Sequence, residues 1–454
     1  MVTARVRRVS AEEQRPAAGS RDGSSGSVSH ELNIRARYLL GADGARSRVR
    51  RQLGINMLGE SYPEDWVIFD VANDRDQEPV SKFYCSKEKP YVSVVAPHGM
   101  RRFEFRAHAS DTSTGPSTAK ERTGAGVRAN LTVVQARRYL AGIRDDIAEQ
   151  NIVRAAMYRF EARVAERWRD GRVFLLGDAA HLTPPFAGQG MNAGFRDAHN
   201  IAWKLGVVLA LRTHPAHASA SAMTSDILLD SYEIERRPAA EAMIQLAVAM
   251  GDIIMPQDDA DVAFRRQAME WLARFDGAKE WVAGMKFKPK PSYSAGAFVD
   301  VAQQPFTGSI VGQMLPQPPM VGARLDDVIG HGFAIVVQQP AVARFAAAQR
   351  ALLWPELTPT LVAIYTAPHE ELGAGEAQAD NAPRKLQPDR SNPHCVAPLA
   401  ALMVHRDQLL LIRPDRYVAA AFWPSLRSAS DAVAAFRVQL GQAGTGASGG
   451  SSRL

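Results

Sequence analysis

The sequence predicts a mixed α/β fold divided among two or three domains. The chain has 454 residues, of which 46% are hydrophobic, which is typical of a multidomain globular protein with room to bury a large ligand. Residues 38–53 and 172–211 each suggest a strand, a glycine-containing turn and a helix, the order found at the ligand sites of open sheets. Between them, from 66 to 106, apolar and polar residues alternate, which indicates an antiparallel sheet.

The bulk composition excludes several classes of protein. The net charge is +6, but the basic residues are scattered, so no nucleic-acid surface is expected. Cys85 and Cys395 form no C-x-x-C pair, which argues against a disulfide framework or a zinc site and fits the reducing cytoplasm. No signal peptide and no run of roughly 18 apolar residues occurs, so neither export by that route nor a membrane span is predicted.

The amino-terminal part predicts a strand pair and then a strand–turn–helix unit. Residues 2–6 and 32–36 alternate as strands do, and the Gly/Ser-rich stretch 19–29 is expected to form the loose tip between them. Residues 38–40 predict a short buried strand that runs into Gly41-Ala42-Asp43-Gly44, and residues 47–53 predict a helical turn. The two elements together form the first candidate ligand site.

The central part predicts the antiparallel sheet and one helix. Strands are expected at 66–73 and within 91–106, where Pro97-His98-Gly99 makes the turn. The Ser/Thr/Gly-rich stretch 110–126 predicts a surface loop, and residues 132–142 predict a helix.

The second strand–helix unit has the clearest pattern in the chain. Residues 172–176 predict a strand that ends in Gly177-Asp178, and a helix is expected at 190–211. A further helix at 227–250 is expected to be interrupted by Pro238. The apolar residues at helical spacing in 190–211 are Met191, Phe195, Ala198, Ile201, Ala202, Leu205 and Leu209.

The carboxyl-terminal part predicts a small α/β domain behind a Pro-rich linker at 304–319. The closing stretch 441–454 is rich in Gly and Ser and is expected to be a disordered tail. The expected strands are Phe333–Val337, Leu361–Tyr365 and Ala401–Ile412, and the expected helices are Ala341–Leu353 and Ser430–Leu440.

The segment Gly177 to Asn192, GDAAHLTPPFAGQGMN, carries the chemistry. Asp178, at the carboxyl end of a strand, is placed to bind a sugar-like hydroxyl, although a cap or turn role is the common alternative for such an Asp. Pro184-Pro185 should stiffen an extended stretch with outward carbonyls, and Gly188 and Gly190 let backbone approach a flat ring. Gly190, Met191 and Asn192 open a helix whose free amides favour negative charge, as on the anion of a reduced flavin; Phe195 is expected in the core.

Gly171 to Leu205, GRVFLLGDAAHLTPPFAGQGMNAGFRDAHNIAWKL, resembles the second FAD-binding signature of the class A flavoprotein aromatic hydroxylases, which have the p-hydroxybenzoate hydroxylase-like fold. The resemblance implies that Asp178 binds the ribityl chain and that Pro185 backs the reactive edge of the isoalloxazine. It also implies that the amides of Gly190, Met191 and Asn192 contact the pyrimidine edge.

Three further segments extend the resemblance. Tyr38 to Arg50, YLLGADGARSRVR, resembles the family's middle motif, which implies that Asp43 and Gly44 lie by the FAD pyrophosphate and matter for nicotinamide cofactor use; alone, Asp-Gly is a common turn. Leu228 to Pro238 resembles the helix that follows. Leu409 to Val418, LLLIRPDRYV, resembles the thioredoxin-like domain of the phenol hydroxylase and 3-(3-hydroxyphenyl)propionate hydroxylase branch. Without C-x-x-C that domain has no thioredoxin chemistry, so packing or homodimer formation is the expected use.

One family feature is not found. Complete members begin with a strand, a G-x-G-x-x-G turn and a helix that bind the ADP pyrophosphate. The nearest match here, Gly124 to Ala129, follows the polar stretch 117–123 and is interpreted as a loop. An amino-terminally truncated enzyme is therefore expected, and one that binds FAD weakly or not at all on its own.

The resemblance gives an α/β fold with an FAD-binding domain of the p-hydroxybenzoate hydroxylase type, an antiparallel substrate-domain sheet and a thioredoxin-like domain. The expected divisions are 1–60 (partial FAD-binding domain), 61–165 (sheet and helix), 166–303 (second FAD motif and helices), 304–319 (linker), 320–440 (thioredoxin-like domain) and 441–454 (tail).

The implied activity is hydroxylation of a phenolic substrate with FAD as cofactor, NAD(P)H as transient co-substrate and O₂, through a flavin C4a-hydroperoxide. The sheet 66–106 is expected to wall the pocket, and Phe186 to touch substrate or to be an ordinary core aromatic. No catalytic residue and no metal ligand is assigned, because His98 lies in a turn and His181 within the cofactor motif. A reductase or halogenase of the same fold and a non-catalytic remnant remain as alternatives.

Overall fold

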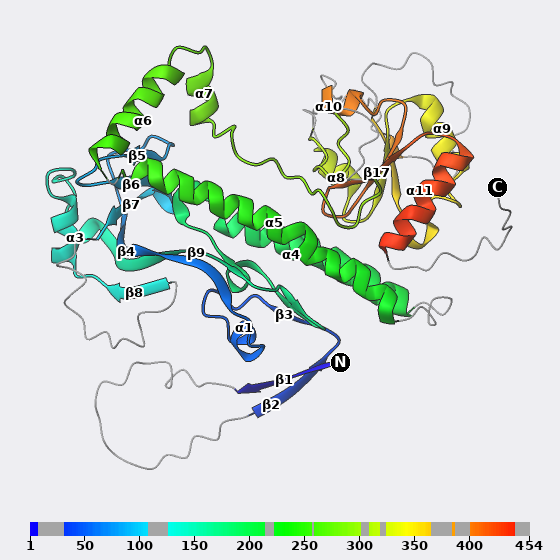
Figure 1. Cartoon of the computed structure of the whole chain (residues 1–454), viewed down its shortest axis with the longest axis horizontal. Helices are drawn as coiled ribbons and strands as arrows, with labels where there is room; N and C mark the ends of the chain where they lie inside the picture. The colour runs from blue at the N-terminus through cyan, green and yellow to red at the C-terminus, as the bar shows by residue number, and fades with distance from the viewer. Residues whose placement is uncertain are drawn as a thin grey trace. The chain divides into compact units, whose positions relative to one another are not determined.

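The computed structural model describes residues 1–7, 31–107, 126–213, 222–256, 258–300, 308–317, 324–364, 384–385 and 400–440. The chain forms two compact units, one of residues 1–191 with 250–262 and one of 192–249 with 263–454 (Figure 1). The sequence did not predict a division into these two units. The finer domain boundaries expected from the sequence stay predictions.

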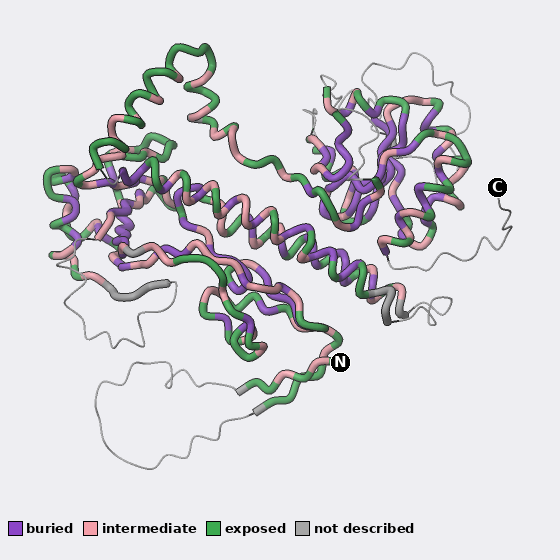
Figure 2. The backbone as a smooth tube through the Cα atoms, viewed as in Figure 1, coloured by how far each residue is buried: buried purple, intermediate pink, exposed green. Residues whose placement is uncertain are grey.

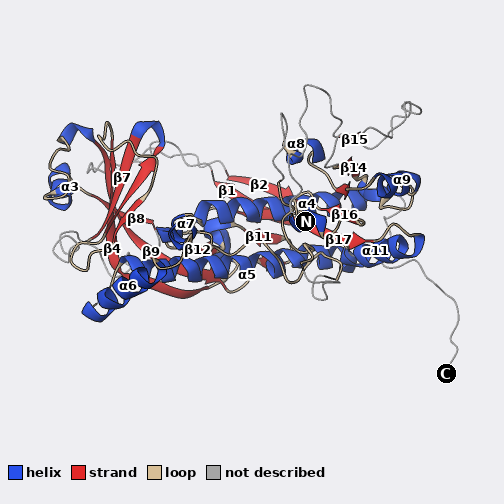
Figure 3. Ribbon diagram, turned by 90° about the horizontal axis from the view of Figure 1, so that it is seen from above, coloured by secondary structure: helices blue, strands red, loops and turns tan. Residues whose placement is uncertain are grey.

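The first unit contains two small β structures (Figure 3). Strands β1 (Val2–Arg7) and β2 (Glu31–Ala36) pair in antiparallel fashion, as predicted, and the Gly/Ser-rich tip lies outside the described residues. A three-stranded sheet has the order β10 (Arg169–Asp170), β11 (Val173–Leu175), β3 (Leu39–Gly41). The expectation that β3 is buried is wrong for Leu40, which is 46% exposed, because β3 is an edge strand in the described part of this sheet.

The larger sheet of the first unit is antiparallel, as predicted. Its order is β12 (His181–Leu182), β9 (Ile152–Ala165), β4 (Met57–Val71), β7 (Met100–Arg106), β6 (Tyr91–Ala96), β5 (Lys82–Tyr84). Pro97–Gly99 makes the expected turn between β6 and β7. The helix predicted at 132–142 is α3 (Val133–Leu140), and the side chain of Thr132 caps it.

One loop prediction fails at this sheet. Residues Gly126–Asn130 form strand β8, which pairs with β9, because β9 offers backbone hydrogen bonds beyond its pairing with β4. The part of the near match to G-x-G-x-x-G from Gly126 onward is therefore a strand and not a loop. The rest of the stretch, 108–125, lies outside the described residues.

Both faces of the sheet carry apolar residues, and residues 65–71 of β4, one of its central strands, are all buried (Figure 2). One face packs against α3 in a cluster that includes Phe69, Phe105 and Tyr139. On the other, Trp66 and Phe160 pack with residues that follow in the chain, Phe186, Ile254 and Met255. The second face is therefore covered by these residues. In this it differs from many antiparallel sheets, in which one face is polar and exposed to solvent.

Two long helices follow the second motif. Helix α4 (Gly190–Thr213) begins in the first unit and continues in the second, and α5 (Ala222–Ile254) runs through Pro238, so the predicted interruption is wrong. Buried residues on both sides of Pro238, such as Arg236 and Ala240, hold α5 helical there. Phe195 is 63% exposed instead of in the core, because the buried face of α4 carries Asp197, Asn200 and Lys204.

Helices α6 (Asp259–Leu272) and α7 (Ala278–Ala283) come next. Over the described residues, no single helix is long and apolar enough to cross a membrane; α5 from Asp226 together with α6 passes that test only as a pair bent by 104°.

The carboxyl-terminal part of the second unit is a five-stranded sheet with helices. The order is β15 (Arg384–Lys385), β14 (Thr360–Ala363), β13 (Ala334–Val337), β16 (Leu409–Ile412), β17 (Val418–Phe422). Strands β13 and β14 are parallel, whereas β16 and β17 are antiparallel to their neighbours, as in a thioredoxin-like domain. Its helices are α8 (Leu325–Ile329), α9 (Pro340–Ala348), α10 (Ala400–Met403) and α11 (Leu426–Gln439).

Three predictions for this domain need correction. Residues Ala401–Met403 belong to helix α10 and not to a strand, because Leu402 turns into the core there. Strand β17 was missed, since its Ala-rich sequence shows no alternation. The described part of the linker, 308–317, contributes Ile310, Val311 and Leu315 to the domain core, so it is not a spacer.

Candidate functional site

The two sequence motifs meet at one edge of the three-stranded sheet. Strands β3 and β11 are parallel, with Leu39 opposite Val173 and Gly41 opposite Leu175. The register continues beyond the strands, since the Leu176 amide donates to the Gly41 carbonyl at 3.0 Å. Because both strands point the same way, the turns that begin at Gly41 and at Gly177 leave the same edge, where open sheets bind ligands.

Asp43 caps the first helix of the unit. Its carboxylate accepts hydrogen bonds from the Ser47 hydroxyl at 2.5 Å and from the amides of Arg48 at 2.7 Å and Val49 at 3.1 Å, at the start of α1 (Arg48–Gln52). Burial pushes the pKa of Asp43 up, but these hydrogen bonds outweigh it and leave the pKa below its usual value. Gly44 takes a φ of 81°, which favours glycine. Asp43 and Gly44 therefore have a structural role as a turn that caps α1. Their role in cofactor binding stays a prediction.

Arg50 ties the two motifs together. Its buried guanidinium donates to the carbonyl of Ala179 at 3.0 Å, in the second motif, and to that of Ala45 at 2.9 Å, in the first. Sequence reasoning placed Arg50 in the helix but missed this function. The only signal was a basic residue among several in the first motif.

Asp178 presents a free carboxylate at this edge. It lies in the 3-10 turn Gly177–Ala179 directly after β11, and it is exposed. Among the residues that the structure describes, no hydrogen-bond or ion-pair partner for its side chain is found. Unlike Asp43, Asp178 is therefore available to a ligand hydroxyl.

The segment around Pro185 differs from the expectation. Pro184 is extended, with a ψ of 148°, as expected, but Pro185–Ala187 forms a 3-10 turn in which the Gly188 amide donates to the Pro185 carbonyl at 2.8 Å, so this carbonyl does not point outward. Pro185 itself is exposed. Gly188 has a φ of 61°, and a Cβ added there or at Gly190 would meet no atom within 4 Å. The backbone is thus open to a flat group at both glycines.

Helix α4 begins at the surface. Gly190 is its first residue, Met191 is 72% exposed and Asn192 is exposed, so the first amides of this long helix face outward. The supporting residues are buried instead: His181 stacks on Trp168 with ring centres 5.2 Å apart, and both side chains are nearly inaccessible. His181 is therefore a packing residue, and exposed His98 lies in the β6–β7 turn with a φ of 61°.

Phe186 is the centre of an aromatic cluster on the covered face of the large sheet. Its ring lies 5.5 Å from those of Trp66 and Phe160 and 6.0 Å from that of Tyr62. A Cβ at Gly251 would come within 2.9 Å of it. Phe186 is therefore a core aromatic, which is one of the two interpretations from the sequence. A core aromatic can also line a pocket, so contact with substrate stays a prediction.

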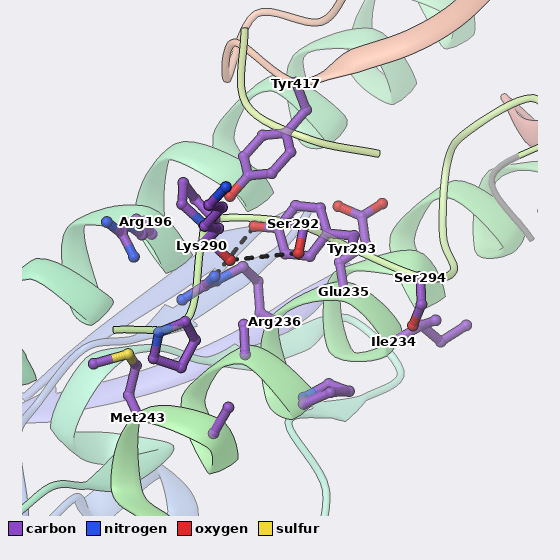
Figure 4. A pocket seen from close by; sticks show the side chains of 15 residues that line it. Arg196, Ile234, Glu235, Arg236, Met243, Lys290, Ser292, Tyr293, Ser294 and Tyr417 are labelled. Carbon is purple, nitrogen blue, oxygen red and sulfur yellow. Dashed lines mark hydrogen bonds between the residues drawn. The ribbon is translucent and has the colours of Figure 1, made fainter. Parts of the chain in front are cut away.

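The second unit holds a separate pocket of about 180 Å³ between α5 and residues 289–294 (Figure 4). Arg236 forms its base, donating to the Tyr293 hydroxyl at 3.1 Å and to Asp197 at 2.9 Å. Tyr293 in turn stacks on Tyr417. No residue predicted for the site lies in this pocket, and two of its charged residues, Glu235 and Arg236, form buried ion pairs.

These residues fit the isoalloxazine and ribityl part of a flavin. Asp178 is a free acceptor, Gly188 and Gly190 leave open backbone, and the amides that begin α4 favour negative charge. Across the described residues, no group of three or more His, Cys, Asp or Glu side chains is placed to hold a metal ion.

Comparison with known proteins agrees with the geometry. Residues 2–247 match the family described as FAD binding domain, and residues 312–437 match the HcaD C-terminal domain. The chain is 34% identical to a 3-(3-hydroxy-phenyl)propionate/3-hydroxycinnamic acid hydroxylase of Burkholderia cenocepacia, over 86% of this chain and 66% of the relative. A hydroxylase of the same name from Klebsiella pneumoniae is 33% identical, over 90% of this chain and 68% of that protein.

Solved structures show the same fold. Aklavinone-11 hydroxylase in complex with FAD and aklavinone has a TM-score of 0.58 at 24% identity, covering 90% of this chain and 69% of that one. The anhydrotetracycline hydroxylase OxyS of Streptomyces rimosus gives a TM-score of 0.58 at 22% identity, covering 90% and 70%. The chain thus belongs to the FAD-binding domain family, and it spans about two thirds of the length of the curated relatives.

Proposed function

We propose that this chain is the flavin-holding part of an FAD-dependent monooxygenase that hydroxylates a phenolic ring, with NAD(P)H as the reductant. The observation that carries the proposal is the convergence of the two motifs: residues separated by more than 130 positions leave one sheet edge together and are tied there by Arg50. The names of the relatives support a small hydroxylated aromatic acid as the substrate class.

Each site residue has a physical task in this proposal. Asp178 accepts hydrogen bonds from the hydroxyls of the ribityl chain, and the turn at Pro185 backs the ring system. The amides at the start of α4 stabilise negative charge on the pyrimidine edge. When bound, the flavin supplies the redox chemistry by which oxygen from O₂ is transferred to the ring. The protein excludes water and orients the substrate, for which the covered sheet face around Trp66 is suited.

The test is a titration of the purified chain with FAD, followed by flavin fluorescence and carried up to about 1 mM FAD, so that the weak binding expected from the sequence is still detected. Replacement of Asp178 by Ala should weaken FAD binding at least about tenfold, because a charged acceptor of hydrogen bonds is lost. The change should leave the melting temperature within about 1 °C, since Asp178 is exposed. Asp431→Ala, an exposed acid on α11, is the matched control and should bind FAD like the parent chain.

Activity is measured next on the flavin-saturated chain. NAD(P)H oxidation that rises on addition of a hydroxylated aromatic acid, with a hydroxylated product, supports the monooxygenase. Saturable FAD binding that Asp178→Ala leaves unchanged would contradict the proposed site. Flavin reduction without any oxygenated product would favour the reductase reading.

A further inference from the structure

Glu104 lies in the middle of the covered face of the large sheet. It belongs to β7, and its direct neighbours across the sheet are Ile68 on β4 and Val92 on β6. Residues opposite each other on paired strands share a face, so Glu104 lies on the same side as Val92, a member of the cluster of Trp66 and Phe186. Only 8% of Glu104 is accessible.

The carboxyl of Glu104 has no partner, in contrast to the other buried acids. In the described part of the chain it makes no hydrogen bond and no ion pair, although Arg102, two residues away, is placed nearby. Arg102 is already engaged by Asp70 through two hydrogen bonds, at 2.7 and 3.1 Å. The other buried acids whose ion-pair partners the structure gives are Asp65 with Arg159, Asp74 with Arg144, Glu161 with Arg163, Asp197 with Arg236, Glu235 with Arg413 and Asp415 with Arg413.

A buried carboxyl without a donor is costly, because it loses hydration and gains nothing in return. Such a group is explained when a ligand supplies the missing donor. The face that carries Glu104 selects that ligand: Val92, directly opposite Glu104, packs in one cluster with Trp66, Phe160 and Phe186, so a ring that carries a hydroxyl complements both the carboxyl and the aromatic residues of this face.

We propose that Glu104 accepts the hydrogen bond, and during the reaction the proton, of the substrate's phenolic hydroxyl. This assignment rests on the function proposed above, and it identifies the base that takes the phenolic proton, for which the sequence indicated no residue. The phenolic O–H bond breaks, the proton passes to a carboxylate oxygen of Glu104, and the electron pair stays on the phenolic oxygen, which makes the ring more electron-rich. The protonated carboxyl later returns its proton to solvent.

The charged surroundings are compatible with that role. Burial raises the pKa of Glu104 to about 6, although Arg102 lowers it, and Asp70 adds to the rise. Near neutral pH the group is therefore mostly a carboxylate, and a base works best when its pKa lies near the working pH. The other titratable groups on this face are Tyr62 on β4, Cys85 after β5, Arg106 on β7, and Arg154 and Tyr158 on β9, with Asp252 of the covering helix α5 near Tyr62.

The first test determines whether Glu104 stabilises the folded chain. Because its folded pKa is above the unfolded value, its stability cost is absent at low pH and is complete above about pH 6. Glu104→Leu should therefore raise the melting temperature at pH 8 by about 2 °C or more and by less at pH 5. Glu161→Gln, which removes a partnered acid on β9, should lower it. A melting temperature lowered by Glu104→Leu at pH 8 would make Glu104 a structural residue and overturn the proposal.

The second test uses two ligands that differ only at the hydroxyl: 3-(3-hydroxyphenyl)propanoate and its O-methyl ether, measured by equilibrium dialysis at pH 8 with FAD present. The parent chain and Glu161→Gln should prefer the phenol about tenfold, and Glu104→Gln should lose most of that preference. If Glu104→Gln keeps the parent chain's preference for the phenol, the assignment is overturned, while FAD binding leaves the proposed function standing. Binding of neither compound by a flavin-loaded chain also overturns the assignment, whereas failure of FAD itself to bind contradicts the proposed function and this assignment with it.

Discussion

Each unit contains a buried glutamate, and the two glutamates differ in whether the chain supplies partners for their carboxyl groups. Glu104 lies among apolar residues without a partner, whereas Glu235 on α5 is fully buried and surrounded by donors. Arg413 approaches Glu235 at 2.7 Å, Lys204 at 3.0 Å, and the Ala297 amide at 2.9 Å. Asn200 donates to it as well, at 2.6 Å.

The pKa values separate the two residues in the same way. Burial pushes the pKa of both upward, but at Glu235 the charges of Arg413 and Lys204 reverse the effect and lower it to about 2. At Glu104, where no donor compensates, burial leaves the pKa at about 6. A buried charge whose partners come from the same chain holds architecture together, whereas one without them is available for chemistry.

The largest effect is expected from removing Arg413, which pairs with both Glu235 and Asp415. Arg413→Ala takes away one of the two cations that face Glu235 and the ion-pair partner of buried Asp415, and it should cost about 3–5 kcal/mol of unfolding free energy, measured by urea denaturation. Arg324→Ala, which breaks an ion pair whose side chains are 77% and 54% exposed, should have almost no effect. A loss below about 1 kcal/mol for Arg413→Ala would show that the partners of Glu235 do not stabilise the fold, and the proposed difference between the two glutamates would be wrong.

A smaller, pH-dependent effect is expected at Lys204. Burial lowers its pKa from 10.5 to about 7, since Glu235 offsets only part of the cost and Arg413 adds repulsion. The folded state thus binds fewer protons than the unfolded state between these values, and stability should rise as the pH increases from 7 toward 10. Lys204→Met should flatten that rise in urea titrations across this range. An unchanged slope would show that the proton is not lost on folding.

The smallest effect is expected at Ser47, which both caps α1 and donates to Asp43. Ser47→Ala should cost about 1 kcal/mol. It should also raise the pKa of Asp43 toward its ordinary value, because one hydrogen bond to the carboxylate is lost, as followed by NMR titration. Ser425→Ala, at the cap of α11 in the other unit, is the control and should leave the pKa of Asp43 unchanged. No shift in Ser47→Ala would mean that the two amides alone hold the carboxylate.

Much of the site was predictable because its signals are local. The turn at Gly177-Asp178, the start of α4 at Gly190 and the short helix within 47–53 follow from glycines and local patterns within a few positions, whereas the capping role of Ser47 was not predicted. The 3-10 turn at Pro185 was not predicted, since a pair of prolines suggests extended chain.

The buried contacts were not predictable in the same way. Asp197, Asn200 and Lys204 follow helical spacing, which in sequence suggests a solvated face, and only contact with α5 and with Arg413 shows that this face is buried. The same reasoning assigned Phe195 to the core. Glu104 was missed because its alternation with Phe103 and Phe105 is typical of a half-exposed strand, and only Phe186 and its neighbours show that this face is covered.

The pairing of β3 with β11 also has a consequence for synthesis. Gly41 and its partner Leu175 are 134 positions apart (175 − 41), so at about 5–20 residues per second roughly 7–27 s pass on the ribosome between them. During that interval β3 has no β11 to pair with, and Arg50 has no second motif to bind. The edge that gathers the flavin residues is therefore among the last parts of its unit to assemble, which makes a slow or interrupted nascent chain most vulnerable there.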